Sequence, residues 1–145
     1  MNNENLQFAS DLRTVLTRLV KKLRKQSVTG QQFSLTERST LALLLYSDSG
    51  LLPSELASAE KITNQSMSQI LNRFLEDGFI CRTASETDKR KVIITITELG
   101  KQIIMQVLSE RDEWMAQALM QTCTVDEQGI LKKAIGPLTK LVDFE

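Results

Sequence analysis

The 145-residue sequence contains no histidine, and it has only two cysteines, two prolines and six glycines. Without histidine the chain lacks the commonest general base, the commonest activator of a serine or cysteine nucleophile and the commonest metal ligand. No glycine-rich phosphate-binding loop is present either. An enzyme would have to rely on carboxylates or lysine alone, so we expect neither an enzyme nor a bound metal or cofactor.

The two cysteines lie far apart in the sequence. Cys81 and Cys123 are isolated, which predicts neither a disulfide framework nor a cysteine-rich metal site. Cys81 lies in an expected strand, where we expect it to be buried as a small apolar side chain. Cys123 has room to be exposed, and a redox role for either thiol stays open. No apolar run suits a signal peptide or a membrane span, so a cytoplasmic location is expected.

The formal net charge is zero, with 18 basic and 18 acidic residues, but the charges are unevenly placed. Lysine and arginine outnumber the acids in residues 1–25 and 61–91, whereas acids outnumber them in residues 26–60 and 92–145. Two basic segments within an acidic remainder favour a polyanionic partner that binds one face of the molecule.

Apolar spacing and capping signals predict four helices before residue 78. Ser34 and Glu37 form a capping-box pattern, Pro53 suits a first helical position, and Thr63 and Gly78 suit the two ends of the fourth helix. The expected elements are a first helix through Leu12 and Leu23, a loop at 28–33, a second helix from Ser34 to about Tyr46, a third from about Ser54 to Glu60 and a tight turn at 61–63.

The rest of the chain predicts a hairpin and two longer helices. Alternating apolar runs at 79–83 and 92–96 read as two strands, with residues 84–91 as their loop. Thr97 is expected to cap a fifth helix, and the capping box that begins at Thr124 is expected to open a sixth. Pro137 is expected to kink or end that helix. The expected fold class is therefore mainly α with a small β-hairpin.

This order of elements is typical of a winged helix-turn-helix: two helices, a three-residue turn, a further helix and a hairpin. In this arrangement the helix after the turn fits the DNA major groove, and the hairpin reaches the minor groove or the backbone. One side of this helix is apolar, while the other offers amides and hydroxyls with no carboxylate in its first two turns. The candidate DNA-binding residues here are Thr63, Asn64, Gln65, Ser66, Ser68, Gln69 and Arg73, and Asn72 shares their polar side.

The hairpin loop carries a second group of candidates. Asp88 is followed by three consecutive cations, Lys89, Arg90 and Lys91. A solvated loop is the ordinary explanation of such a charge run. Its position directly after a helix-turn-helix favours contact with DNA instead.

Several motifs stand out in the segment 53–100. They are Ser54-Glu55-Leu56-Ala57, Ile62-Thr63, Ser66-Met67-Ser68-Gln69-Ile70-Leu71-Asn72-Arg73, Leu75-Glu76-Asp77-Gly78-Phe79-Ile80, and a wing pattern of Asp88, Arg90, Thr97 and Gly100. With these motifs the segment resembles the MarR family of bacterial transcription regulators. Ile96 stands where the family pattern has leucine.

The resemblance implies one domain over residues 1–145, with a winged helix-turn-helix part at about 34–97 flanked by N- and C-terminal dimerisation helices at about 5–30 and 98–145. It implies a homodimer that binds a short palindromic operator in double-stranded DNA, usually as a repressor. Arg90 would enter the minor groove, and Asp88 would brace it.

Other properties of the family carry over in part. Many members respond to a small phenolic or lipophilic effector, although no short motif marks that site here. Sensing of hydroperoxides through a first-helix cysteine and sensing of zinc through histidine are not expected, because those residues are missing. A winged-helix protein-interaction module without DNA binding stays open as the alternative, but such a module has no need of the three loop cations.

Overall fold

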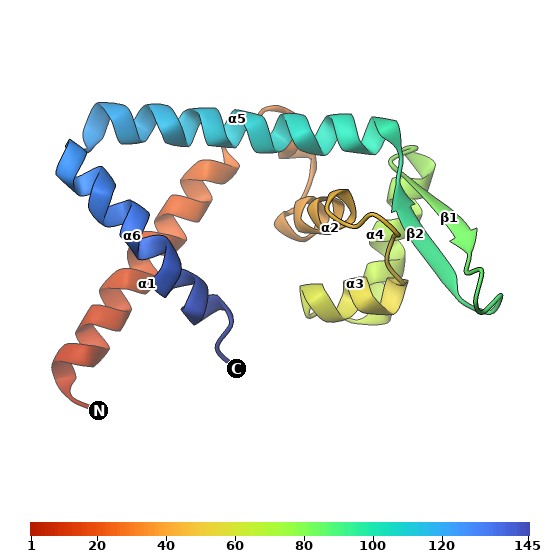
Figure 1. The fold of residues 1–145 in the computed structure, drawn as a ribbon, viewed down its shortest axis with the longest axis horizontal. Helices are drawn as coiled ribbons and strands as arrows, with labels where there is room; N and C mark the ends of the chain where they lie inside the picture. The colour runs from red at the N-terminus through yellow and green to blue at the C-terminus, as the bar shows by residue number, and fades with distance from the viewer.

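The computed structural model describes residues 1–145. Figure 1 shows α5 running along one edge of the molecule, with a globular part below one end and the crossing helices α1 and α6 below the other. The elements are α1 (Asn3–Arg24), a short 3₁₀ helix η1 (Thr29–Gln32), α2 (Leu35–Leu45), α3 (Pro53–Glu60), α4 (Asn64–Glu76), β1 (Ile80–Ala84), β2 (Val92–Ile96), α5 (Glu98–Thr122) and α6 (Val125–Val142).

The predicted capping residues begin their helices as expected. The Ser34 hydroxyl accepts a hydrogen bond from the backbone N–H of Glu37 at 3.1 Å, and the Glu37 carboxylate accepts one from the Ser34 N–H at 3.0 Å. Thr63 caps α4, Thr97 caps α5, and Thr124 opens α6 with a second complete capping box. Each cap satisfies N–H groups that have no partner within the helix, so the start of each helix is fixed by local sequence.

Two glycines fix the path of the chain around the hairpin. Gly78 has φ of 78°, a left-handed conformation that ends α4 and turns the chain into β1. Gly100 lies in the first turn of α5, where a Cβ atom would be 2.2 Å from the Phe79 carbonyl oxygen. Only glycine lets α5 start this close to the hairpin.

The hairpin is antiparallel and pairs Ile80 with Ile96 at one end and Ala84 with Val92 at the other. Leu51, between α2 and α3, adds a short third segment that the sequence did not predict. Its N–H donates to the Ile94 carbonyl at 3.0 Å, and the Ile94 N–H donates to the Leu51 carbonyl at 2.8 Å. This bridge ties the wing to the helix-turn-helix.

All 13 buried apolar residues lie between Phe33 and Val107. They come from the end of η1, from α2, α3, α4 and the hairpin, and from the first half of α5. Phe33, Phe74 and Phe79 pack together with ring centroids 5.8 to 6.2 Å apart, which fixes α4 against the start of α2 and the start of β1.

A cluster of hydrogen bonds connects the segment between α1 and α2 to α5. The hydroxyls of Ser27 and Thr29 donate to the two carboxylate oxygens of Glu110 at 2.6 and 2.9 Å, and these bonds hold the pKa of Glu110 below its ordinary value. The buried Arg38 of α2 donates to the carbonyl of Gly30 and, through its terminal nitrogens, to that of Arg24 at the end of α1. These hydrogen bonds therefore hold the globular part in a defined position relative to α1 and α5.

Three sequence predictions are corrected. The expected loop at 28–33 contains the 3₁₀ turn η1. Pro137 does not end the last helix, which continues to Val142; the carbonyl group that loses its partner to proline belongs to Lys133, which is exposed to solvent. Cys81 is exposed rather than buried, because no helix covers the outer face of β1.

The helices α1 and α6 contain no buried residue. Their exposed apolar side chains include Leu6, Phe8, Val15, Leu16 and Val20 on α1 and Ile130, Leu131, Ile135, Leu141 and Val142 on α6. None of the helices is both long enough and apolar enough to cross a membrane.

Candidate nucleic-acid interface

Helix α4 presents one apolar and one polar side. Met67, Leu71 and Phe74 are buried. The predicted contact residues lie on the exposed side, and the first turn carries no acidic residue. The exposed predicted residues of this helix and its cap are Thr63, Asn64, Gln65, Ser66, Ser68, Gln69 and Arg73. A long polyanion can approach this side without meeting a carboxylate until Glu76.

The hairpin loop, or wing tip, is a small structured turn that projects its cations. The Asp88 carboxylate accepts hydrogen bonds from the Arg90 backbone N–H at 3.1 Å and from Arg90 Nε at 3.2 Å. The Arg90 side chain is nevertheless 91% exposed, whereas that of Asp88 is 31% exposed. Asp88 thus holds Arg90 through its backbone N–H and its Nε, and the terminal nitrogens of the guanidinium stay available to a ligand.

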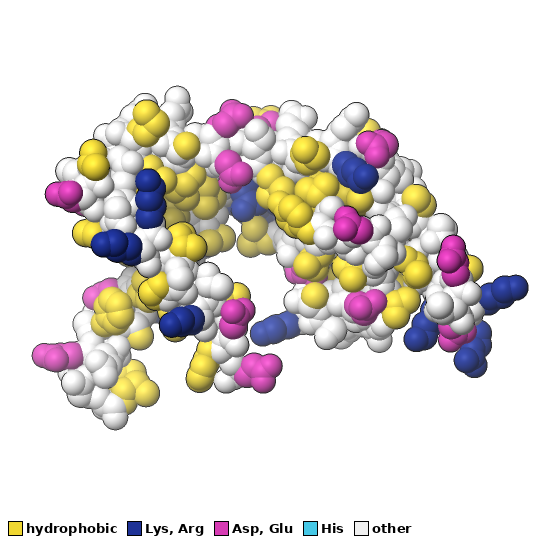
Figure 2. All heavy atoms as spheres, viewed as in Figure 1, with side chains coloured by type: hydrophobic (Ala, Val, Ile, Leu, Met, Phe, Trp, Pro, Cys, Tyr) yellow, Lys and Arg dark blue, Asp and Glu magenta, His cyan; other side chains and the backbone are white.

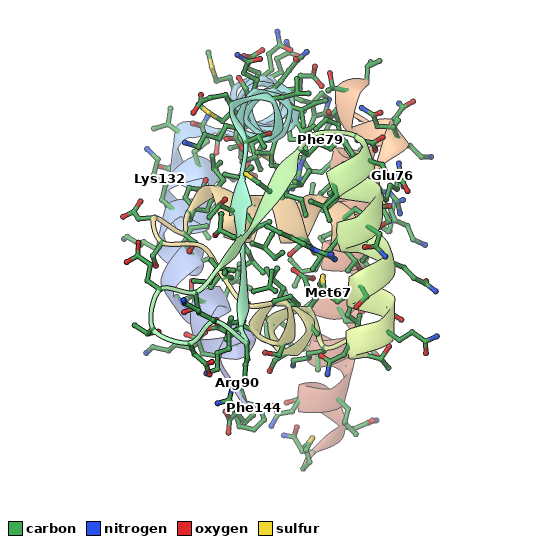
Figure 3. The ribbon with its side chains drawn as sticks, turned by 90° about the vertical axis from the view of Figure 1, so that its right-hand side faces the viewer. Met67, Glu76, Phe79, Arg90, Lys132 and Phe144 are labelled. Atoms are coloured by element: carbon green, nitrogen blue, oxygen red, sulfur yellow. The ribbon has the colours of Figure 1, made fainter.

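The cations gather where the wing ends. Figure 2 shows dark-blue side chains grouped at the far end of the hairpin, and Figure 3 places Arg90 there, below the N-terminal end of α4. Lys89, Arg90 and Lys91 are all exposed. The backbone of the loop is held by bonds from the Ser85 N–H to the Lys91 carbonyl and from the Lys91 N–H to the Asp88 carbonyl, at 2.9 and 3.0 Å.

The structure brings the wing and α4 together in one hollow. A hollow of about 330 Å³ is lined by Asn64 and Ser68 of α4, by Lys91 and Val92 of the wing, and by the segment 52–54 at the start of α3. Polar residues from α3, α4 and the wing therefore line one space, which suits a phosphate of a bound duplex.

Two residues near this surface, Ser54 and Arg82, were not predicted from the sequence as contact residues. Ser54 joins the hollow because Pro53 starts α3 there. Arg82 of β1 donates to the Asn72 side-chain carbonyl at 3.1 Å and adds a positive charge beside α4. The alternation of β1 was a usable signal for Arg82, because it places this residue on the same face of the strand as the buried Ile80.

Arg73 differs from the other predicted contacts. Its guanidinium donates to the Glu37 carboxylate at 2.6 Å and to the Gln32 carbonyl at 3.0 Å. The side chain is still 46% exposed, but its donors are largely occupied within the protein. Its charge is therefore much less free than that of Arg90.

The arrangement defines a class of protein, a winged helix-turn-helix transcriptional regulator, and comparison with known proteins agrees. Residues 33–92 match the model of the MarR family. An uncharacterised HTH-type transcriptional regulator of Mycobacterium bovis is 29% identical over 143 residues, which cover 99% of this chain and 98% of that protein. The HTH-type transcriptional repressor YetL of Bacillus subtilis is 31% identical over 91 residues, 63% of this chain and 54% of that protein.

Solved structures give the same result. A transcriptional regulator from Pseudomonas aeruginosa is similar with a TM-score of 0.85 and 25% identity, over all of both chains. A variant of MepR from Staphylococcus aureus, solved bound to an oligodeoxyribonucleotide, has a TM-score of 0.67 and 20% identity over 93% of this chain and 97% of that chain. This protein is a DNA-binding transcriptional regulator whose residues 33–92 match the MarR family.

Proposed function

We propose that this protein binds a short palindromic operator as a homodimer, with α4 in the major groove and the wing tip in the adjacent minor groove. The observation that carries the proposal is the pairing of a carboxylate-free polar side on α4 with an exposed, braced Arg90 at the wing tip. Amides and hydroxyls suit base edges, and an extended arginine suits a narrow minor groove.

The homodimer is supported by the apolar sides of α1 and α6. Figure 2 shows hydrophobic side chains lining the angle between α5, α6 and α1, where a single chain leaves them open to water. Exposed apolar surface of this extent is uncommon on a monomer, and two-fold pairs are the commonest way to cover it. A two-fold dimer would place its two α4 helices on half-sites roughly 10 base pairs apart.

We further propose that binding represses transcription and that a small aromatic or lipophilic effector reverses it. The repressor role is supported by the name of the relative YetL. A candidate effector site is a hollow of about 510 Å³ between the end of α2 and α5, with Tyr46 and Met105 among its lining residues. Asp112 and Glu113 also line it, so a neutral or cationic aromatic fits better than an aromatic carboxylate such as salicylate.

Selection of bound sequences from a random duplex pool tests the proposal. An enriched inverted repeat with half-site centres about one helical turn apart is expected. Enrichment of no sequence, with no binding to any duplex, would instead favour a protein-interaction module. Release of the selected duplex by neutral or cationic aromatics, and not by salicylate, is the expected result for the effector.

A further inference from the structure

The polar contacts of Arg73 tie the recognition helix to the start of α2. Its Nη1 donates to Glu37 Oε2 at 2.6 Å, and its Nη2 donates to the Gln32 carbonyl at 3.0 Å. The guanidinium also lies 6.0 Å from the centroid of the Phe33 ring, on the cluster that packs α4. The Glu37 carboxylate, the Gln32 carbonyl and the Phe33 ring thus meet Arg73 near the C-terminal end of α4.

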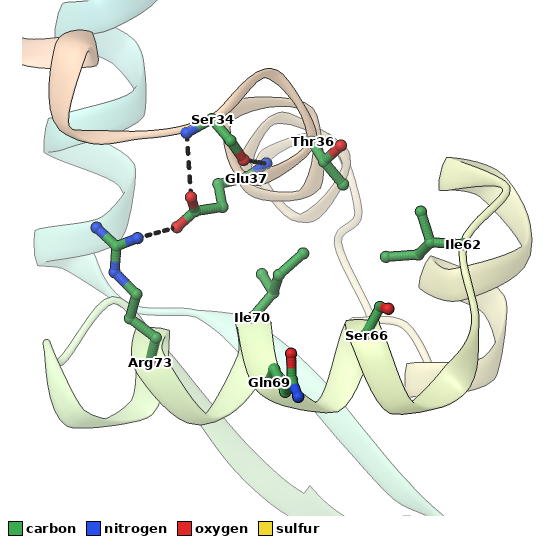
Figure 4. Close-up of a pocket in the computed structure, with 8 residues that line it drawn as sticks. All are labelled: Ser34, Thr36, Glu37, Ile62, Ser66, Gln69, Ile70 and Arg73. Carbon is green, nitrogen blue, oxygen red and sulfur yellow. Dashed lines mark hydrogen bonds and ion pairs between the residues drawn. The ribbon is translucent and has the colours of Figure 1, made fainter.

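Glu37 serves both sides of this contact. Only 8% of the residue is exposed, and its two carboxylate oxygens have different partners. Oε1 accepts from the Ser34 N–H in the capping box of α2, and Oε2 accepts from Arg73. Figure 4 shows this chain of contacts running from Ser34 through Glu37 to Arg73. A nearly buried carboxylate needs such compensation for its charge.

A hollow beside the ion pair bears on how the pair affects the rotation of α4 about its axis. About 420 Å³ of open space separates the first turn of α2 from the middle of α4, and Thr36, Ser66 and Gln69 are among the residues that line it. The hollow is open to solvent, so α2 and α4 are less tightly packed against each other on this side than at the phenylalanine cluster. The ion pair spans the gap at one end, and Gln69 and Ser66 would move with any such rotation of α4.

We propose that Glu37 and Arg73 are a positioning pair that sets the rotation of the recognition helix, so that Arg73 acts on operator binding through α4 and not by touching DNA. The inference rests on the proposed DNA-binding function and deepens it. A direct phosphate contact by Arg73 makes opposite predictions for Glu37, because removing a carboxylate near DNA strengthens a purely electrostatic interaction.

Glu37→Gln is the decisive variant. Glutamine keeps an oxygen that accepts from the Ser34 N–H, so the cap survives while the charge that holds Arg73 is lost. We expect Glu37→Gln and Arg73→Gln each to weaken operator binding by about tenfold, an effect within the range measured for coupled pairs. The double variant should be no weaker than either single variant, and the dependence of affinity on salt should keep its wild-type slope.

Two further variants separate positioning from charge. Glu55→Gln is the matched control, because Glu55 caps α3 by accepting from the Leu52 N–H at 2.9 Å and has no arginine partner; its operator affinity should match or slightly exceed that of wild type. Arg73→Lys keeps the charge but not the planar fork that reaches Glu37 and Gln32 together. It should lose operator affinity nearly as much as Arg73→Gln.

The measurements are salt titrations of the full-length variants on the selected operator and on a random duplex, with thermal melting as the check on folding. Tight binding by Glu37→Gln or Arg73→Lys, together with a lower salt slope for Arg73→Gln on both duplexes, would show a direct contact and overturn the inference alone. A wild-type protein that binds no duplex would overturn the proposed function and the inference with it.

Discussion

Truncation of Ile135 tests whether the apolar side of α6 forms a two-fold interface. Ile135 is 64% exposed in the single chain. Full burial of an isoleucine side chain is worth about 1.5–3 kcal/mol, so covering its exposed part and then removing most of its carbons changes the free energy by about 1–2 kcal/mol per protomer. A two-fold dimer contains Ile135 twice, so the free energy of dimerisation changes by about 2–4 kcal/mol. The dissociation constant of the dimer then rises roughly 30- to 700-fold.

Sedimentation velocity over a dilution series measures this change for Ile135→Ala. Val28→Ala is the matched control, because Val28 is 80% exposed but lies at the start of η1, outside the crossing helices. The control should dissociate like the wild type. A wild-type protein that sediments as a folded monomer at micromolar concentration would refute the reasoning, and so would an Ile135→Ala dimer as tight as the control.

Four other substitutions, one of them a control, probe the fold and the surface. Gly100→Ala should lower the free energy of unfolding by about 1–3 kcal/mol in thermal melts, because its Cβ would lie 2.2 Å from the Phe79 carbonyl oxygen, whereas Gly129→Ala in α6, with no atom within 4 Å, should be neutral or stabilising. Ser27, followed by Thr29 and Gln106, holds the pKa of Glu110 below its ordinary value, so the carboxylate stabilises the fold at neutral pH and loses that effect as the pH falls through the lowered pKa. Glu110→Gln should therefore be less stable than wild type at pH 7, and the difference should shrink below about pH 4 in melts across a pH series. Cys81→Ser should leave operator affinity within a few-fold both before and after peroxide treatment, since Cys81 is exposed but bonds only Thr95, at 3.5 Å; a large peroxide effect that the serine abolishes would contradict this.

Local sequence signals were enough to predict the order of the elements. A cap such as Thr63 or Ser34 makes its bond to a residue three positions away, and the sixth helix begins at a capping box for the same reason. The amphipathic pattern of α4 likewise separates Met67 and Phe74 from the polar side without reference to the rest of the chain. The features that were predicted well are therefore those whose causes lie within one helical turn or one strand pair.

Features that depend on distant contacts could not be read in this way. Glu37 is a capping residue by sequence, but its second oxygen binds Arg73, which lies 36 positions later. The burial of Ser27 depends on Glu110 of α5, and the exposure of Cys81 depends on the lack of a covering element on β1. The polar side of α4 therefore identified candidate residues, but only the three-dimensional structure separates Arg73, which is bound to Glu37, from the more exposed Arg90.

The most direct test of DNA binding through α4 and the wing is a salt titration of Arg90→Ala and Gln69→Ala on the operator and on a random duplex. Arg90→Ala should weaken binding to both duplexes and should lower the salt slope by about one per protomer, because an exposed wing arginine reads charge and groove shape. Gln69→Ala should cost about 1–3 kcal/mol on the operator and leave random-duplex binding nearly unchanged, because its amide would contact a base edge. Loss of affinity for the operator alone in both variants would contradict the role of the wing, and no loss in either would contradict the use of this helix and wing to bind DNA.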